Sequence, residues 1–314
     1  MALGPRRPMA STARVKCVRW RVSTVALILA ACERQPSPRA SRDGSSAVAP
    51  AHPVELSPQD AWSGSPGTVI ATASGDDGPP ILFMSDTSWL GAVDVELFGH
   101  DSYVARSVFE VGARTGSCAW QRDARLTVAS DGSKPVPWSL ALSPGIGWPL
   151  AVDAIGDLPP RDSSAFAILI SRLASARRDD SVSAPFRGLP VVVRDAWRLQ
   201  LPDGTPVAVA VAMRSMNLES NPRAEMVTIV AEPDPRSSIA GWVTAWTWRD
   251  AGPEERVEGT DLLAALELSD GHAVLVFVRE GAHGLQLEFV ERATPGSWRM
   301  RWNSARLSCR VPPS

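Results

Sequence analysis

A repeated hairpin constrains the fold of this chain more than any other feature of its sequence. Residues Leu199–Val211 align without a gap with Leu266–Val278, and seven of the thirteen aligned positions are identical. The identical residues are two leucines, an Asp-Gly pair and three alternating valines. Alternating valines favour strands, and Asp-Gly is a preferred hairpin dipeptide because both residues tolerate positive φ. The chain is therefore expected to contain two copies of one strand–turn–strand unit.

The same alternation, interrupted by turn signals, predicts strands from residue 68 onward. The expected N-terminal strands are 68–73, 81–85, 91–98, 105–111, 125–129 and 138–142. Two sets of four follow, at 191–201, 207–214, 226–232 and 242–249, and at 262–268, 274–279, 285–291 and 298–303. We therefore predict a mainly β fold of repeated antiparallel hairpins or meanders, either propeller-like or a sandwich.

One segment departs from the β pattern. Apolar residues recur at helical spacing between Ser163 and Arg178, and they are Phe166, Leu169, Ile170, Leu173 and Ala176. Asp162 or Ser163 is a suitable N-cap, and two arginines occupy the last turn. The pattern predicts an amphipathic helix near 163–178 that packs its apolar stripe on the sheet.

The first 31 residues have the features of an export signal. Six basic residues and no acidic one lie within residues 1–21, and a short apolar run, Val22–Ala31, ends at Cys32. Such a run is too short to span a bilayer. The residues Leu29-Ala30-Ala31-Cys32 resemble the lipobox of bacterial lipoproteins. The resemblance implies cleavage before Cys32, lipid attachment to its thiol and a location in the cell envelope, on the outer-membrane or periplasmic side. The alternative is an ordinary secretory signal.

The signal is followed by a segment that cannot form a core. Residues 32–67 are rich in Ser, Pro, Ala and Gly and nearly lack large apolar side chains. Such a composition predicts a disordered tether. The expected organisation is a signal peptide at 1–31, a tether at 32–67 and a mainly β domain at 68–314.

The net charge and the cysteine content indicate which partners and which covalent links to expect. Removal of the signal leaves 26 basic and 34 acidic residues, a formal net charge of about −8. An acidic surface repels nucleic acid, so we expect no nucleic-acid partner. Cys118 and Cys309 remain after cleavage, and in an exported protein such a pair predicts a disulfide. Two buried free thiols are the alternative.

The repeated unit also resembles a known kind of repeat. Trp197–Arg214 and Leu266–Arg279 are similar to the FG-GAP repeats of integrin-like propellers, in which several acidic residues bind calcium. This chain keeps only Asp203 in one copy and Asp270 in the other, whereas calcium takes six to eight oxygen ligands. The resemblance therefore implies shape, and we predict no metal site and no cofactor. A calcium-stabilised adhesion module is kept as an alternative.

Motifs for catalysis are missing from the sequence. It contains no Gly-x-Ser-x-Gly nucleophile motif, no His-Glu-x-x-His zinc motif and no glycine-rich phosphate loop. We therefore assign no catalytic residue. Glu219 and Glu225 flank a loop, where paired carboxylates could hydrolyse a glycan. The simpler interpretation is that they are solvated loop residues.

Tryptophans supply the remaining candidate site. Trp242, Trp246 and Trp248 alternate and are expected on one face of a strand, either as core residues or as a carbohydrate-binding face. The sequence as a whole predicts a membrane-anchored envelope lipoprotein with a non-enzymatic binding or scaffolding role. Its expected partners are the membrane, through the lipid, and an envelope protein or glycan. An envelope glycan hydrolase is the enzymatic alternative.

Overall fold

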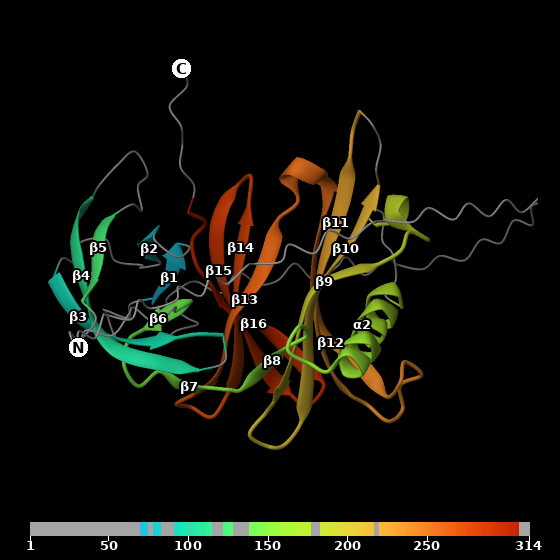
Figure 1. Ribbon diagram of the computed structural model, residues 1–314, viewed down its shortest axis with the longest axis horizontal. Coiled ribbons are helices and arrows are strands. Elements are labelled where there is room, and N and C mark those ends of the chain that lie inside the picture. The colour runs from blue at the N-terminus through green and yellow to red at the C-terminus, as the bar shows by residue number, and fades with distance from the viewer. Residues whose placement is uncertain are drawn as a thin grey trace, which may run out of the picture. The chain divides into compact units, whose positions relative to one another are not determined.

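The computed structural model describes residues 70–74, 78–82, 91–100, 102–114, 122–127, 138–176, 183–216 and 220–307. The predicted signal and tether lie outside these ranges. Within them, the strands form three antiparallel sheets accompanied by the helix α2 (Figure 1). The predicted mainly β fold class is confirmed.

The first of two similar sheets has the strand order β12-β11-β10-β9-β8. Its strands are β8 (Val152–Ala154), β9 (Val192–Gln200), β10 (Pro206–Met216), β11 (Arg223–Pro233) and β12 (Trp242–Pro253). Strands β9–β12 form a continuous antiparallel meander, the first meander, and the short β8 pairs with β9 at one edge. The 3-10 helices η1 (Ala184–Phe186) and η2 (Glu254–Arg256) precede and follow this meander.

The second sheet repeats this plan with the order β16-β15-β14-β13-β7. Its strands are β7 (Gly147–Pro149), β13 (Gly259–Leu268), β14 (Ala273–Gly281), β15 (Gly284–Thr294) and β16 (Ser297–Asn303). Strands β13–β16 form the second meander, and β7 pairs with β13 as β8 pairs with β9. All eight meander strands were predicted from the sequence, whereas the three-residue strands β7 and β8 were not.

The third sheet, the N-terminal sheet, has the order β2-β1-β6-β3-β4-β5. Its strands are β1 (Ile70–Ser74), β2 (Gly78–Leu82), β3 (Gly91–Phe98), β4 (Tyr103–Arg114), β5 (Arg122–Thr127) and β6 (Leu140–Leu142). Each overlaps a predicted strand. Strands β2 and β5 each begin three residues before their predicted starts, at residues 81 and 125.

Helix α2 spans Pro160–Ser175 and therefore begins earlier than the predicted 163–178. Proline is well tolerated in the first turn of a helix, where its missing N–H has no intrahelical acceptor to lose. The predicted N-caps are wrong: the helix begins after Pro159 without a side-chain cap, and the Ser163 hydroxyl donates back to the carbonyl of Pro160. Asp162 lies in the first turn, where its negative charge interacts favourably with the positive end of the helix dipole.

The helix packs on the sheet as expected, against small side chains. Phe166, Ile170 and Leu173 are buried in one cluster with the alanines of β10, at positions 208, 210 and 212. Alanine at every second position lets the helix approach the sheet closely. The opposite face of β10 carries the repeated valines, so the two faces of this strand pack against two different layers.

The repeated valines face different neighbours in the two meanders. Val207, Val209 and Val211 enter the core between the two meanders, where they pack with Leu275 and Phe277 of β14. The valines of β14 point the other way, toward Phe98, Leu140 and Leu142 of the N-terminal sheet. The meanders are therefore stacked front to back: the valine face of the first covers the opposite face of the second. Face-to-face packing of sheets is the arrangement of a β sandwich.

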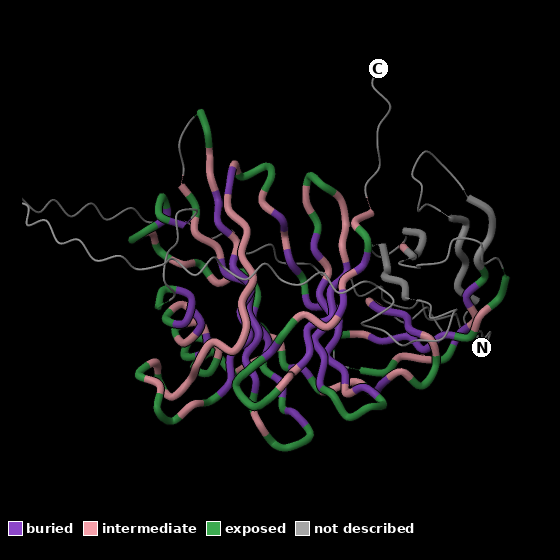
Figure 2. The backbone as a smooth tube through the Cα atoms, turned by 180° about the vertical axis from the view of Figure 1, so that it is seen from behind, coloured by how far each residue is buried: buried purple, intermediate pink, exposed green. Residues whose placement is uncertain are grey.

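Burial follows this layering. The buried segments, purple in Figure 2, run along the strands of the two meanders, whereas the connecting turns are largely exposed. In the part of the chain that the structure describes, no helix has the length and apolar character needed to cross a membrane.

Candidate functional site

The two Asp-Gly turns have the same backbone geometry. Both glycines have a φ of 81°, a region that favours glycine. In the first turn the amide of Thr205 donates to Oδ1 of Asp203 over 2.9 Å, and in the second the amide of His272 donates to Oδ1 of Asp270 over 3.1 Å. One carboxylate oxygen of each aspartate therefore stabilises its own turn.

The second oxygen of each aspartate binds an arginine. Arg292 of β15 reaches Asp203 over 2.6 Å, and Arg301 of β16 reaches Asp270 over 2.7 Å. Both turn carboxylates are thus neutralised by ion pairs, which gives no support to a calcium role for them. Among the described residues, no group of three or more His, Cys, Asp or Glu side chains is placed to hold a metal ion.

The same arginines also bind buried glutamates. Arg292 makes two hydrogen bonds to Glu232, at 2.8 and 2.9 Å, and Arg301 donates to Glu291 over 2.9 Å. Glu232 further accepts the indole N–H of Trp298 over 2.6 Å. Strand register makes the two glutamates equivalent, because each lies on the third strand of its meander beside the first repeated valine. Each Asp-Gly turn is therefore tied to the sheet through an arginine and a buried carboxylate.

The three candidate tryptophans do not share one face of β12, so that prediction is wrong. A β-bulge at Ala245 shifts the register, because Val230 pairs with Trp246 but the next residue of β11 pairs with Thr244. Trp242 consequently packs on the helix side of the sheet and Trp246 in the core between the meanders. Trp246 stacks on Phe277 with ring centroids 5.9 Å apart. A bulge adds one residue to one strand and so reverses the alternation beyond it.

Glu225 is not a loop residue, contrary to both sequence interpretations of it. It lies in β11 with no exposed surface. Its carboxylate forms ion pairs with Arg214 and Arg249 and accepts the hydroxyl of Ser183 over 2.5 Å. Both guanidinium groups contact this carboxylate, and burial separates it from solvent. This geometry gives no support to Glu225 as a glycosidase acid.

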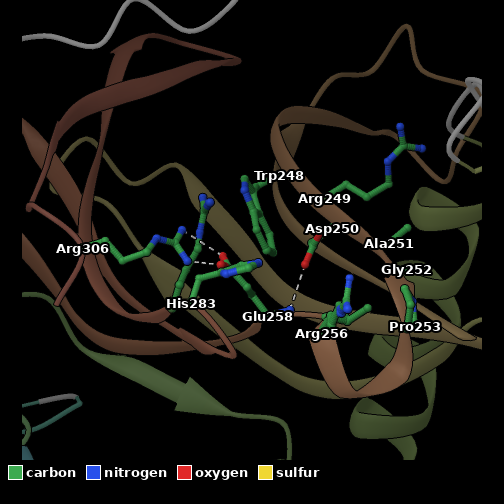
Figure 3. Close-up of a pocket in the computed structure, with 12 residues that line it drawn as sticks. Trp248, Arg249, Asp250, Ala251, Gly252, Pro253, Arg256, Glu258, His283 and Arg306 are labelled. Atoms are coloured by element: carbon green, nitrogen blue, oxygen red, sulfur yellow. Dashed lines mark hydrogen bonds and ion pairs between the residues drawn. The ribbon is translucent and has the colours of Figure 1, made fainter. Parts of the chain in front are cut away.

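Trp248 of the tryptophan set lines a pocket formed by described residues, and we call this recess the Trp248 pocket. It has a volume of about 350 Å³. Its lining comes from the end of β12, the segment around η2, β14, the β14–β15 turn and Arg306 near the end of the described chain (Figure 3). The pocket therefore depends on the packing of the first meander against the second.

The carboxylates of the Trp248 pocket are engaged within the protein. Arg306 forms a two-pronged ion pair with Glu258 and also donates to Gln286 over 3.0 Å. Asp250 accepts the backbone amide of Glu258 over 2.9 Å (Figure 3). These contacts connect β12, the start of β13 and the C-terminal segment, and so shape the wall of the pocket.

A cation stacked on an indole forms the inner part of the pocket. The guanidinium carbon of Arg279 lies 3.7 Å from the ring centroid of Trp248, and Arg279 forms a buried ion pair with Glu288. Burial lowers the pKa of Arg279 to about 10 and raises the pKa of Glu288 to about 7. Arg279 therefore remains a cation at neutral pH, whereas Glu288 titrates within the neutral range.

Other predicted site residues lie outside the described residues. These are the lipid-attachment residue Cys32, the expected disulfide partners Cys118 and Cys309, and Glu219. The lipid anchor, the disulfide and the Glu219 part of the hydrolase hypothesis therefore stay predictions.

Two features of the described residues were not found from the sequence, and a sequence signal exists for one of them. The tryptophan spacing Trp242-x-x-x-Trp246 recurs at Trp298 and Trp302, with a bulge at the same place in each fourth strand. This second repeat would have revealed the tryptophans as equivalent core residues. No comparable signal marks the Trp248 pocket, because its residues come from five separate segments.

No protein-family model, curated protein or solved structure matched this chain.

Proposed function

We propose that the protein is a lipid-anchored component of the bacterial cell envelope whose β domain binds a ligand without chemically changing it. The anchoring half of the proposal rests on Leu29-Ala30-Ala31-Cys32, placed directly after a basic segment and a short apolar run. The binding half is carried by one observation, the Trp248 pocket, in which an indole and several guanidinium groups converge. Its volume lies within the range of small-molecule sites, about 300–1,000 Å³.

Binding is favoured over catalysis by the state of the carboxylates around this pocket. A general acid or base must reach the proton that it transfers. Glu258 is held by Arg306, Glu288 by Arg279, and Asp250 by a backbone amide. These groups therefore act as structural partners of the arginines, and the recess is better suited to hold a molecule than to transform it.

Cell fractionation tests the anchor. The full-length chain should sediment with membranes and resist a high-salt wash, because two or more acyl chains hold a protein stably whereas electrostatic contacts are screened. Cys32→Ser should move the protein into the soluble fraction. Cys17→Ser is the matched control, since it removes a thiol that the proposal discards with the signal. Retention of the Cys32→Ser protein on washed membranes would falsify the anchor.

A further inference from the structure

The Trp248 pocket carries an inference about its ligand that deepens, and rests on, the proposed binding function. Hydrogen-bonding groups inside a recess are either used by the protein or free for a ligand. A count of the unused groups therefore indicates what chemistry the ligand must bring.

The acceptors of the pocket are largely used. Both carboxylate oxygens of Glu258 bind Arg306, and Oδ2 of Asp250 accepts a backbone amide. Behind the lining, the carboxylate of Glu288 is paired with Arg279. A ligand that brought mainly donors would have to compete with these ion pairs.

Donors, in contrast, are in excess. The side chain of Arg279 is only 7% exposed, and its Nε–H has no acceptor within the described part of the chain. Arg256 and His283 also line the pocket, both are exposed, and neither forms a hydrogen bond or ion pair with a described residue. A buried N–H without an acceptor is costly, so an oxyanion that reached the inner wall of the pocket and accepted from it would be bound favourably.

The type of donor defines the acceptor further. Guanidinium groups present planar forks of N–H donors that match carboxylate and phosphate oxygens and bind them through two parallel hydrogen bonds. The faces of Trp248 and Pro253 supply apolar surface for the rest of a small molecule. A cationic ligand would meet Arg256, Arg279 and Arg306 and be repelled.

We propose that the Trp248 pocket binds an oxyanion, a carboxylate or phosphate group, through Arg256 at its exposed side and Arg279 at its inner side. The group is carried either by a free solute or by an anionic lipid headgroup, and both sources offer the same oxygen acceptors. Trp248 holds the Arg279 guanidinium in place by stacking, and Glu288 holds its other edge.

Calorimetric titration of the full-length lipidated protein in neutral detergent tests this proposal. The probes are inorganic phosphate, acetate and, as a neutral probe, N-acetylglucosamine. Phosphate or acetate should bind at a single site, and the neutral sugar should not. Arg256→Ala should weaken oxyanion binding by about tenfold, the loss expected for one charge-assisted contact. Arg236→Ala is the control, because this exposed arginine pairs with Asp234 on a distant turn.

A second variant tests Arg279. A single substitution would leave Glu288 buried without its partner, so the pair is replaced together, as Arg279→Met with Glu288→Met. This protein should unfold cooperatively and show no measurable oxyanion binding. Wild-type protein that binds neither anion, or variants that bind as tightly as wild type, would overturn the inference. Binding of N-acetylglucosamine alone would also overturn it, while the proposed binding function would stand.

Vesicles distinguish the two sources. The Cys32→Ser protein is mixed with vesicles of phosphatidylglycerol or phosphatidylcholine and floated on a density gradient. Flotation with phosphatidylglycerol alone, abolished by Arg256→Ala, supports the headgroup. Binding of free phosphate without flotation supports a solute. The fractionation result for Cys32 is independent of both outcomes, so a failed titration and a failed anchor can be told apart.

Discussion

The two meanders of this protein share a framework but use different residues to lock it. Each has an Asp-Gly turn, a buried glutamate on its third strand and a bulge between two tryptophans on its fourth strand. In the second meander the locking arginine is Arg301, the bulge residue itself. The bulge residue of the first meander is Ala245, whose side chain is too short to reach Asp203. Arg292 of the second meander binds Asp203 instead. The lock of the first turn therefore also joins the two sheets.

This difference shows what the identical residues specify. They determine the local hairpin, which is the same in both copies. The residues that differ determine which element packs on each copy. Helix α2 packs on the alanines at 208, 210 and 212, whereas Leu275 and Phe277 in the second copy pack in the core against another sheet. Substitutions at equivalent positions of the two meanders test this difference.

The two buried glutamates, Glu232 and Glu291, should differ most in their contribution to the free energy of unfolding. Glu232→Ala leaves Nε of Arg292 and the Trp298 indole N–H without their acceptor, while Arg292 keeps its bond to Asp203, and we expect a loss of about 3–5 kcal/mol in the free energy of unfolding. Glu291→Ala should cost less, about 1–2 kcal/mol, because the side chain of its partner Arg299 is 69% exposed and water can replace the contact. Urea denaturation measures both.

The exposed Glu255 provides the control for this pair, since Glu255→Ala should change the free energy of unfolding by less than about 0.5 kcal/mol. Equal losses for Glu232→Ala and Glu291→Ala would show that the lock between the sheets adds nothing to the lock within one sheet.

The alanine face of β10 should also be sensitive to substitution. Ala210→Leu enlarges a fully buried side chain beneath helix α2, and overpacking of this kind costs about 1–3 kcal/mol. The equivalent residue of the second meander, Phe277, is already large, so Phe277→Leu makes the opposite change: it leaves a void and removes the ring that stacks on Trp246, at a cost of about 1–2 kcal/mol. Unfolding curves followed by far-UV circular dichroism provide the comparison. A stable Ala210→Leu protein would mean that the helix adjusts its position freely.

Local signals explain why the meanders could be predicted from sequence. Period-two alternation, short apolar runs and turn signals such as Asp-Gly act within about ten residues, and the eight meander strands were predicted from them. The face of Trp242 could not be found in this way, because a single bulge at Ala245 reverses the alternation without a local signature. The burial of Glu225 depends on Arg214, Arg249 and Ser183, which lie on other segments of the chain.

The glycines of the two turns should be equally sensitive. Both have a φ of 81°, and a Cβ at Gly271 would meet nothing within 4 Å, whereas one at Gly204 would meet only the Gln200 side chain at 3.9 Å. Gly→Ala at either position should therefore cost only the backbone strain, about 1 kcal/mol. Gly156→Ala is the control, because a Cβ there also has open space and φ is not positive. Unequal thermal midpoints for the two turn variants would contradict their equivalence.

The pH dependence of stability should also differ between the two meanders. Hydrogen bonds from Thr205 and Arg292 lower the pKa of Asp203 to about 2, so its contribution to stability is present above pH 3.8 and is lost as the pH falls toward 2. Burial raises the pKa of Glu288 to about 7, so its contribution is complete below pH 4.5 and is lost as the pH rises through 7.

Urea midpoints measured between pH 2.5 and 8 test this assignment. Asp203→Asn should flatten the acidic part of the wild-type profile and leave the neutral part unchanged. Glu288→Gln should do the reverse, because it removes the titration between pH 4.5 and 7. A profile that either variant leaves unaltered throughout would contradict the corresponding assignment.

Helix α2 bears on whether another sheet can pack on the outer face of the first meander. Sheets stacked in the same orientation make a contact between unlike surfaces, and such contacts have no built-in end, because each added layer offers a fresh surface to the next. Repeat proteins stop this growth with terminal caps. The helix occupies the position on the first meander that a preceding meander would take, with Phe166, Ile170 and Leu173 on the alanine face. It thus covers the face of the first meander that a further layer would otherwise contact.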